Sequence, residues 1–365
     1  MMREPYAAAR TISARLAEYF AQHRAKALRS GAEHLAPQPD GETIEAIVDA
    51  AFWAGLRREE GYETRISLAL LAPEDADDPI LFERPLPLDP GVLARVAPAV
   101  ERPGIHLGVW GSRGELSVWG AARGIPSLCF VVEAAGPGLL VIKHHTGGET
   151  RKFINVTVLE GDRIMIVDQR ASERPDAPQF LKTLLGADPL AGNGSALSIV
   201  RLAISMREHG RGGMLLIVPP DTDAWRASIL QPIPYAVRPP HRPFAGWVEG
   251  GSPAISALGG LTAVDGAVVL NSRLELLGFG AKIARQRGSP RVDQVLLTEP
   301  VLGSEPALVH TEQVGGTRHL SAAQFVHDQR DSVALVASQD GRFTVFEWSA
   351  AEEKVHAHRV ESLLL

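Results

Sequence analysis

Apolar residues recur at helical spacing in the first sixty residues of the chain. One stripe runs through residues 6–27 and a second through 42–58, with a Pro- and Gly-rich break between them. Such stripes predict two amphipathic helices that each bury one face. The apolar run at 64–73 ends at Pro73 and predicts a strand.

From residue 104 to residue 168 the hydrophobic period changes to two. Short apolar runs alternate with Gly, Pro or charged turns, which is typical of strands joined by tight connections. We expect a β-meander or an extension of a sheet here. A polar, Pro-containing stretch at 169–179 is expected to be a linker.

The C-terminal half alternates between helical and strand patterns. Helices are predicted at 196–210, near 253–260 and from about Ser321, and strands at 211–220, 263–271 and 273–283, with a final hairpin at 331–348. This order predicts an α/β fold, a mixed sheet flanked by helices, preceded by an α+β region with the meander. The expected domains are 1–103, 104–179 and 180–365.

Composition narrows the possible functions. The 365 residues carry a net charge of −6, so a long nucleic acid, which needs a basic face, is not an expected partner. The single cysteine, Cys129, lies in an apolar run and is expected to pack in a core. The first twenty residues lack the apolar centre of a signal peptide, and no run is long enough to span a membrane. We therefore expect a cytoplasmic protein without a membrane partner.

The triplet Asp265-Gly266-Ala267 opens one of the predicted buried strands. A carboxylate beside a glycine that lets a ligand approach the backbone suits a Mg²⁺ or Mn²⁺ ion. The alternative is a turn aspartate that accepts hydrogen bonds from its own backbone. Taken alone, the triplet favours the turn.

The sequence Gly315-Gly316-Thr317-Arg318-His319 precedes a predicted helix. Loop glycines and a helix N-terminus favour an anion, and an arginine can grip two phosphate oxygens at once. The threonine hydroxyl can donate to phosphate, and the histidine can donate or bind a metal. An ordinary loop with an N-cap residue explains the same letters, so both interpretations stay open.

Three blocks in this half resemble the diadenylate cyclase (DAC) domain. In that family a DGA strand–turn–strand is followed by a GTRHR loop that opens a helix, and then by a strand ending in a Ser-Glu-rich turn. The resemblance covers about residues 195–348, and its blocks are VDGAVVLNSRLELLGFGAKI, GGTRHLSAAQF and VALVASQDGRFTVF.

The resemblance implies a pocket for an ATP-type nucleotide. Asp265 would bind a Mg²⁺ or Mn²⁺ ion, with His319 as a second candidate ligand. If the protein is active, these two residues would also be the catalytic ones. In active members two facing protomers each present one ATP, so a homo-oligomer would be required. The residues that would contact the nucleotide are Gly266, Ala267, Gly316, Thr317, Arg318, His319, Ser338 and Asp340.

The chain departs from the family pattern in several places. Leu320 replaces the second arginine of GTRHR, and loss of a phosphate ligand removes charge stabilisation in the transition state. The stretch from the histidine to Asp331 is one residue longer, Ser338-Gln339-Asp340 replaces a glutamate pair, and residues 284–314 form an insertion. These changes resemble the DACNV group, diverged DAC relatives that are regarded as nucleotide sensors and that carry an additional N-terminal region.

The leading hypothesis is therefore a sensor that binds ATP or a related nucleotide, including a cyclic dinucleotide, without efficient catalysis. Its N-terminal region would contact an unknown protein partner or cover the pocket. The alternative is an active diadenylate cyclase that makes cyclic di-AMP from two ATP. A purely structural interaction module would bind no nucleotide. Another pair, His144-His145, is not expected to share a metal ion because adjacent strand residues point to opposite faces.

Overall fold

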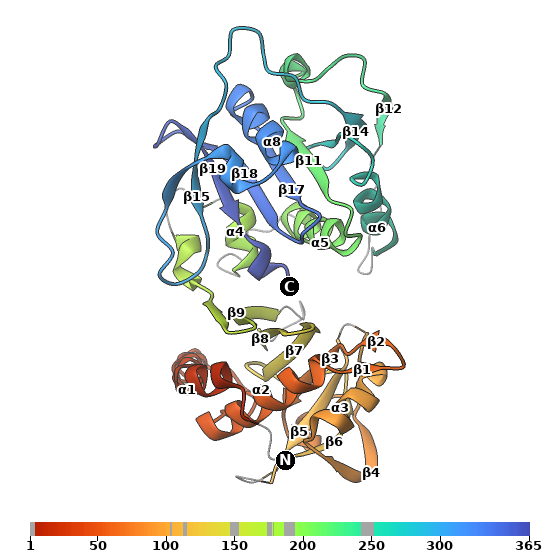
Figure 1. Cartoon of the computed structure of the whole chain (residues 1–365), viewed down its shortest axis with the longest axis vertical. Coiled ribbons are helices and arrows are strands. Elements are labelled where there is room, and N and C mark those ends of the chain that lie inside the picture. Colours follow the sequence, from red (N-terminus) through yellow and green to blue (C-terminus); the bar gives the residue numbers. More distant parts are fainter. Residues whose placement is uncertain are drawn as a thin grey trace. The chain divides into compact units, whose positions relative to one another are not determined.

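The chain folds into two compact units, each with its own large sheet (Figure 1). The computed structural model describes residues 4–102, 104–111, 115–146, 153–173, 177, 179–185, 194–241 and 252–365. Unit 1 comprises Met1–Val167 with Leu365, and unit 2 comprises Asp168–Leu364. The expected boundary after residue 103 lies within unit 1 and the one after 179 within unit 2, and the three-part division stays a prediction.

Unit 1 consists of helices packed on a twisted sheet. Its helices are α1 (Ala7–Arg29), α2 (Gly41–Gly55) and α3 (Pro90–Val96), with 3₁₀ turns η1 (Pro73–Asp75) and η2 (Ala97–Ala99). Its strands are β1 (Arg58–Glu59), β2 (Tyr62–Glu63), β3 (Ile66–Leu70), β4 (Ile80–Pro87), β5 (His106–Trp110), β6 (Ser117–Ala122), β7 (Phe130–Gly136), β8 (Leu139–His145), β9 (Phe153–Glu160) and β10 (Arg163–Ile166).

The two predicted N-terminal helices are present, and their apolar stripes form the core of unit 1. Ile12, Leu16 and Phe20 of α1 pack with the buried face of α2 and with inward residues of the sheet. The N-cap of α2 is Asp40, whose carboxylate accepts a hydrogen bond from the Thr43 N–H at 2.8 Å. Such a cap satisfies one of the free N–H groups at a helix start.

The strands at 104–168 do not form one continuous meander. The sheet order is β10-β9-β8-β7-β3-β5-β6-β4. Consecutive strands pair within β5–β6 and within β7–β10, but β3 lies between β5 and β7 and separates the two groups. β3 pairs parallel with β5 and antiparallel with β7. All five residues of β3 are buried, and a strand buried on both faces belongs in the middle of a sheet. The apolar run of β3 in the sequence is consistent with this central position.

Unit 2 is a larger mixed sheet with helices. Its helices are α4 (Gln179–Leu184), α5 (Gly194–Glu208), α6 (Ser252–Leu261), α7 (Thr311–Val314) and α8 (Thr317–Asp328), with 3₁₀ turns η3 (Gln169–Glu173), η4 (Ala224–Ser228) and η5 (Glu361–Leu363). Its strands are β11 (Gly213–Val218), β12 (Tyr235–His241), β13 (Ala267–Asn271), β14 (Leu276–Ala281), β15 (Gln294–Thr298), β16 (Ala307–His310), β17 (Val333–Ala337), β18 (Phe343–Ser349) and β19 (Lys354–Arg359).

The described strands of unit 2 lie in the order β12-β14-β13-β11-β17-β18-β19-β15-β16. β11 is parallel to β13 and antiparallel to β17, which makes the sheet mixed. Helix α8 packs on one face, where Ala322, Phe325 and Val326 meet inward residues of the central strands. The expected α/β fold, with a mixed sheet flanked by helices after a strand-rich N-terminal region, is confirmed.

Unit 2 differs from the expectation in the start of α8 and in one strand that the sequence patterns did not predict. Helix α8 begins at Thr317, not near Ser321, so Thr317, Arg318 and His319 form its first turn and are not a loop. The insertion at 284–314 also contributes structure, because β15 and β16 pair with each other and β15 continues the sheet beside β19. The strand β19 was not expected from the sequence.

Candidate functional site

The three predicted blocks meet at one edge of the sheet in unit 2. β11 and β13 run parallel, with Leu215 opposite Val268, and β17 runs the other way, with Ala337 opposite Gly213. The starts of β11 and β13 and the end of β17 therefore lie at the same edge. Asp265 and Gly266 precede β13 and Ser338 follows β17, so blocks more than 70 residues apart in sequence become neighbours.

Asp265 is an exposed carboxylate paired with a lysine. Its side chain is 90% exposed and forms an ion pair and hydrogen bond with Lys282, the residue after β14. The Lys282 hydrogen bond and charge, followed by the more distant charge of Arg318, hold the pKa of Asp265 below its usual value. Asp265 is therefore ionised at neutral pH and is within the electrostatic range of the α8 arginine.

The local structure accounts for the small residues at positions 266 and 267. Gly266 has φ +117°, and a Cβ there would lie 2.5 Å from the Gly280 carbonyl carbon, so β13 and β14 could not approach with any larger residue. Ala267 is fully buried among the core residues. The direct contact with a nucleotide expected for both stays a prediction.

Arg318 lies over the start of β11. A Cβ at Gly212 would lie 3.0 Å from Arg318 Nη1, 3.2 Å from the Ala337 carbonyl oxygen and 3.3 Å from Gln339 Cγ. The guanidinium thus lies beside the start of β11 and the end of β17. Gly212 has φ +68°, so this position favours glycine both for its backbone and for the space that the arginine occupies.

The neighbours of Arg318 on α8 differ in exposure. Gly316 is the N-cap, and both it and Thr317 are exposed. The Gly316 carbonyl accepts hydrogen bonds from the N–H groups of His319 and Leu320. An exposed helix start with a hydroxyl and a guanidinium in its first turn is suited to an anion.

His319 points into the core. It is 2% exposed, its ring lies edge-on to Phe346 at 6.0 Å, and its Nε2 has no hydrogen-bond partner among the described residues. Gly315 leaves room for the ring, because a Cβ there would lie 2.3 Å from His319 Nδ1. Burial lowers the pKa of His319 to about 4, against an opposing effect of Asp340. The imidazole is neutral at pH 7.

Ser338 and Asp340 occupy the turn between β17 and β18. The Ser338 hydroxyl donates to the Asp340 carboxylate, and this hydrogen bond is the main cause of the lowered pKa of Asp340. Asp340 also pairs with Arg342 at 3.4 Å. The Arg207 guanidinium, half-buried on α5, donates from Nε to the Gly341 carbonyl at 3.1 Å. Arg207 therefore holds the turn from the side of α5.

An exposed aromatic ring lies next to Asp265. Tyr235 of β12 is 52% exposed and stacks on Phe279 with ring centroids 4.6 Å apart and planes 15° from parallel. A Cβ at Gly280 would lie 2.9 Å from the Tyr235 ring and 3.8 Å from the Asp265 carbonyl oxygen. The phenol thus flanks the same edge of the sheet. The sequence patterns identified neither Tyr235 nor Lys282, because their relation to Asp265 depends on strand pairing.

The donors at this edge do not form a metal site built by the protein alone. Asp265 is exposed and engaged by Lys282, whereas His319 is buried against Phe346. Throughout the described ranges, no group of three or more His, Cys, Asp or Glu side chains is placed to hold a metal. The two residues expected to share a Mg²⁺ or Mn²⁺ ion therefore differ in surroundings, and their metal role stays a prediction.

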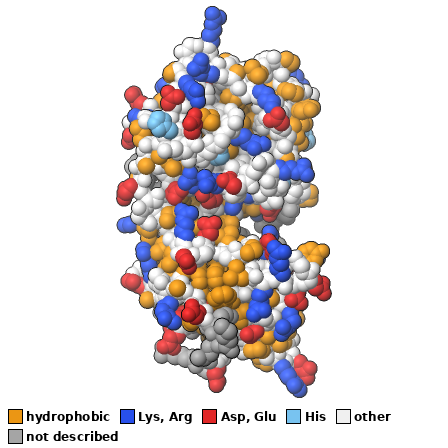
Figure 2. Space-filling view, in the orientation of Figure 1, with side chains coloured by type: hydrophobic (Ala, Val, Ile, Leu, Met, Phe, Trp, Pro, Cys, Tyr) orange, Lys and Arg blue, Asp and Glu red, His pale blue; other side chains and the backbone are white. Residues whose placement is uncertain are grey.

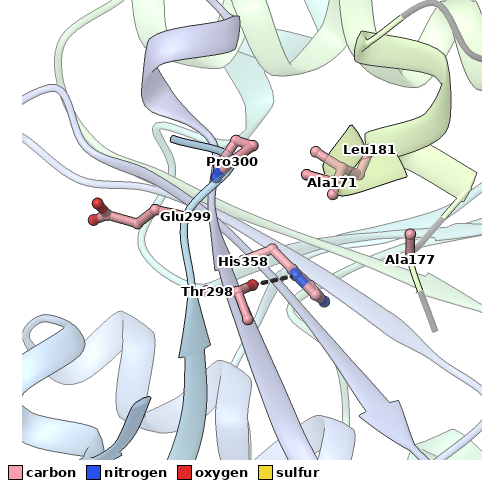
Figure 3. Close-up of a pocket in the computed structure, with 7 residues that line it drawn as sticks. All are labelled: Ala171, Ala177, Leu181, Thr298, Glu299, Pro300 and His358. Atoms are coloured by element: carbon pink, nitrogen blue, oxygen red, sulfur yellow. Dashed lines mark hydrogen bonds between the residues drawn. The ribbon is translucent and has the colours of Figure 1, made fainter. Parts of the chain in front are cut away.

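A small cavity lies elsewhere in unit 2 (Figure 3). Thr298 and His358 face Ala171 and Leu181 across it, and the Thr298 hydroxyl is 2.6 Å from His358 Nδ1. Its volume of about 20 Å³ accommodates about one water molecule. His358 Nε2 is also 3.2 Å from Glu347, so the histidine is hydrogen-bonded on both sides. This cavity is too small for a nucleotide.

The remaining expectations from single residues concern unit 1. Cys129 is buried, as expected, and burial raises the pKa of its thiol. His144 lies near Tyr19 of α1, whereas His145 lies against Phe153. The two imidazoles thus have different surroundings, in agreement with the expected opposite faces. None of the helices in the described part of the chain is long and apolar enough to cross a bilayer.

Comparison with known proteins bears on unit 1. No curated protein matches the chain. The family model described as "Probable sensor domain DACNV" matches residues 33–123, all of which belong to unit 1. The sequence resemblance to the DACNV group is thereby supported, but at the N-terminal unit and not at the motifs of residues 195–348 that suggested it. The chain carries a match to the DACNV sensor domain within unit 1.

Proposed function

We propose that unit 2 binds a nucleotide through its phosphates at the sheet edge defined by Asp265, Arg318 and Ser338, and that unit 1 is the sensory part of the protein. The observation that carries the proposal is the meeting of three distant blocks at one edge. Arg318, in the first turn of α8, lies over Gly212 at the start of β11. The end of β17 pairs with this part of β11, and Ser338 is the next residue along the chain. A guanidinium at a helix start is a strong phosphate ligand.

The exposed ring of Tyr235 supports the binding of a nucleotide rather than of phosphate alone. It flanks the edge beside Gly280 and Asp265, and base stacking on an aromatic ring contributes about 1–3 kcal/mol for each base. Phosphates at Arg318 and a base at Tyr235 would use both features. In Figure 2, acidic and basic side chains are interspersed over the visible face, which fits a small anionic ligand better than a long nucleic acid.

The proposal is tested by calorimetry of the full chain with ATP and with inorganic tripolyphosphate. Arg318→Gln should lower the affinity for both ligands about tenfold or more, because it removes a charge-assisted hydrogen bond. Arg330→Gln is the matched control, since Arg330 is exposed, follows the other end of α8 and lies over Trp348. Tyr235→Ser should weaken the binding of ATP and leave the binding of tripolyphosphate unchanged. Equal affinities in the Arg318 variant and the wild type would refute the proposal.

A diadenylate cyclase is the second candidate, because Asp265 and Arg318 lie at the same edge. Two ATP would give cyclic di-AMP and two pyrophosphates, and chromatography after incubation with Mg²⁺ or Mn²⁺ detects the product. A homo-oligomer would be needed to bring two sites face to face. We expect binding without turnover, since Leu320 supplies no cation in the first turn of α8. A cyclic dinucleotide that disappears in Arg318→Gln would establish the enzyme instead.

A further inference from the structure

Strand pairing places a lysine at the carboxylate expected to bind metal. Ala281 of β14 is opposite Ala267 of β13, so the next residue, Lys282, is on the side of Asp265. The Lys282 carbonyl accepts the Leu230 N–H at 2.8 Å, and Ile229 bridges to Ile283. The backbone that carries the ammonium group is therefore held on both sides, and its ion pair with Asp265 follows from the register.

The charges at this edge favour an anion. Lys282 and Arg318 are two cations that both act on the single carboxylate of Asp265. The Lys282 side chain is 45% exposed, so a ligand can reach the ammonium group while the ion pair with Asp265 stays intact. The first turn of α8 adds the positive end of a helix dipole.

A divalent ion would meet competition at the same carboxylate. It would have to share the Asp265 carboxylate with Lys282, which pairs with Oδ2, and His319 is turned into the core. Mg²⁺ is commonly held by one or two carboxylates together with substrate phosphates, so a metal carried by the nucleotide could still contact Asp265. It would then add a positive charge where one is already present.

We propose that Lys282 takes the place of the divalent metal in this site, so that nucleotide phosphates bind to Lys282 and Arg318 without a metal ion. The inference rests on the proposed nucleotide function of unit 2. Asp265 then has a positioning role, because it holds the ammonium group at the edge. The metal hypothesis and the lysine hypothesis predict opposite results for the same variants.

The test measures ATP and tripolyphosphate affinities by calorimetry, in EDTA and in excess Mg²⁺. The variants are Lys282→Gln, Asp265→Asn and the control Lys354→Gln, which removes the same charge from the exposed start of β19, at the opposite edge of the sheet. Thermal unfolding of each variant confirms that it is folded. Wild type should bind ATP in EDTA at least as tightly as in Mg²⁺.

Lys282→Gln should weaken binding in EDTA about tenfold, the size of one charge-assisted contact, and Mg²⁺ should restore part of the loss because Asp265 becomes free. Asp265→Asn should stay within about threefold of wild type in EDTA, because the loss of the ion pair that positions Lys282 is offset by the loss of a negative charge near the phosphates. The Lys354 control should match wild type. A wild type that binds only with Mg²⁺, or loss of binding in Asp265→Asn with Lys282→Gln unaffected, would overturn the inference. Absence of binding in both buffers would instead refute the nucleotide function itself.

Discussion

Mild acid should destabilise this protein through three buried histidines. His106 and His144 in unit 1 and His319 in unit 2 are each at most 4% exposed. Burial is the main cause that lowers the pKa of each from 6.5 to about 4. The unfolded chain therefore takes up a proton at each site below about pH 6.5, while the folded chain does so only near pH 4. Stability falls as the pH falls through this window.

The local contacts show why the neutral form is favoured. His144 Nδ1 is 3.1 Å from the His145 carbonyl oxygen and its Nε2 is 3.2 Å from the Tyr19 hydroxyl, which can donate to it. His319 Nε2 has no partner among the described residues, so a charge there would lack a hydrogen bond. A pKa lowered to about 4 corresponds to about 2 kcal/mol lost per histidine between pH 7 and pH 5, since one pH unit is about 1.4 kcal/mol.

Urea unfolding followed by tryptophan fluorescence at pH 7, 6, 5.5 and 5 measures this dependence. His319→Gln should remove about 2 kcal/mol of the loss between pH 7 and 5 in the transition of unit 2, whatever it does to stability at pH 7. His241→Gln, at an exposed position, is the control and should keep the wild-type dependence. A variant that lacks His319 and still shows the wild-type slope would refute the reasoning that its buried imidazole is kept neutral.

Three further substitutions probe the site's framework. Gly266→Ala should destabilise unit 2 by at least about 2 kcal/mol, because of its φ and the 2.5 Å approach to Gly280; an unchanged urea midpoint would contradict this. Gly315→Ala should cost about 1–3 kcal/mol, since the new methyl overlaps the His319 ring, and a crystal structure would show the ring displaced. Arg207→Met should lower stability by about 2 kcal/mol and speed hydrogen exchange at residues 338–342, because the Gly341 carbonyl loses its donor.

The sequence predicted most elements of unit 2 because their hydrophobic periods are clear. The strands at 213–218 and 267–271 and the helix at 194–208 lie where the patterns placed them. The start of α8 was placed four residues late, since Thr317, Arg318 and His319 look like a loop when only their polarity is considered. The buried ring of His319 shows that the helical pattern already applies there.

What the sequence could not predict depends on pairing between strands. β3 has the apolar run of a central strand, but nothing local states that it lies between β5 and β7. The same holds for Lys282, whose significance appears only when β14 is placed opposite β13. Local patterns specify which face of an element is buried. The strand register that places residues 265 and 282 close together depends on the whole sheet.

The proposed roles of the two units rest on different observations. The DACNV match is confined to unit 1, and the cations suited to phosphate are in unit 2. In the proposed site Lys282 and Arg318 supply positive charge to a bound phosphate, but Leu320 offers none to a leaving group. Phosphoryl transfer needs charge stabilisation that increases in the transition state, while binding needs it only in the ground state. A site in which Lys282 is already paired with Asp265, and in which Leu320 replaces a cation, is therefore better matched to holding a nucleotide than to joining two.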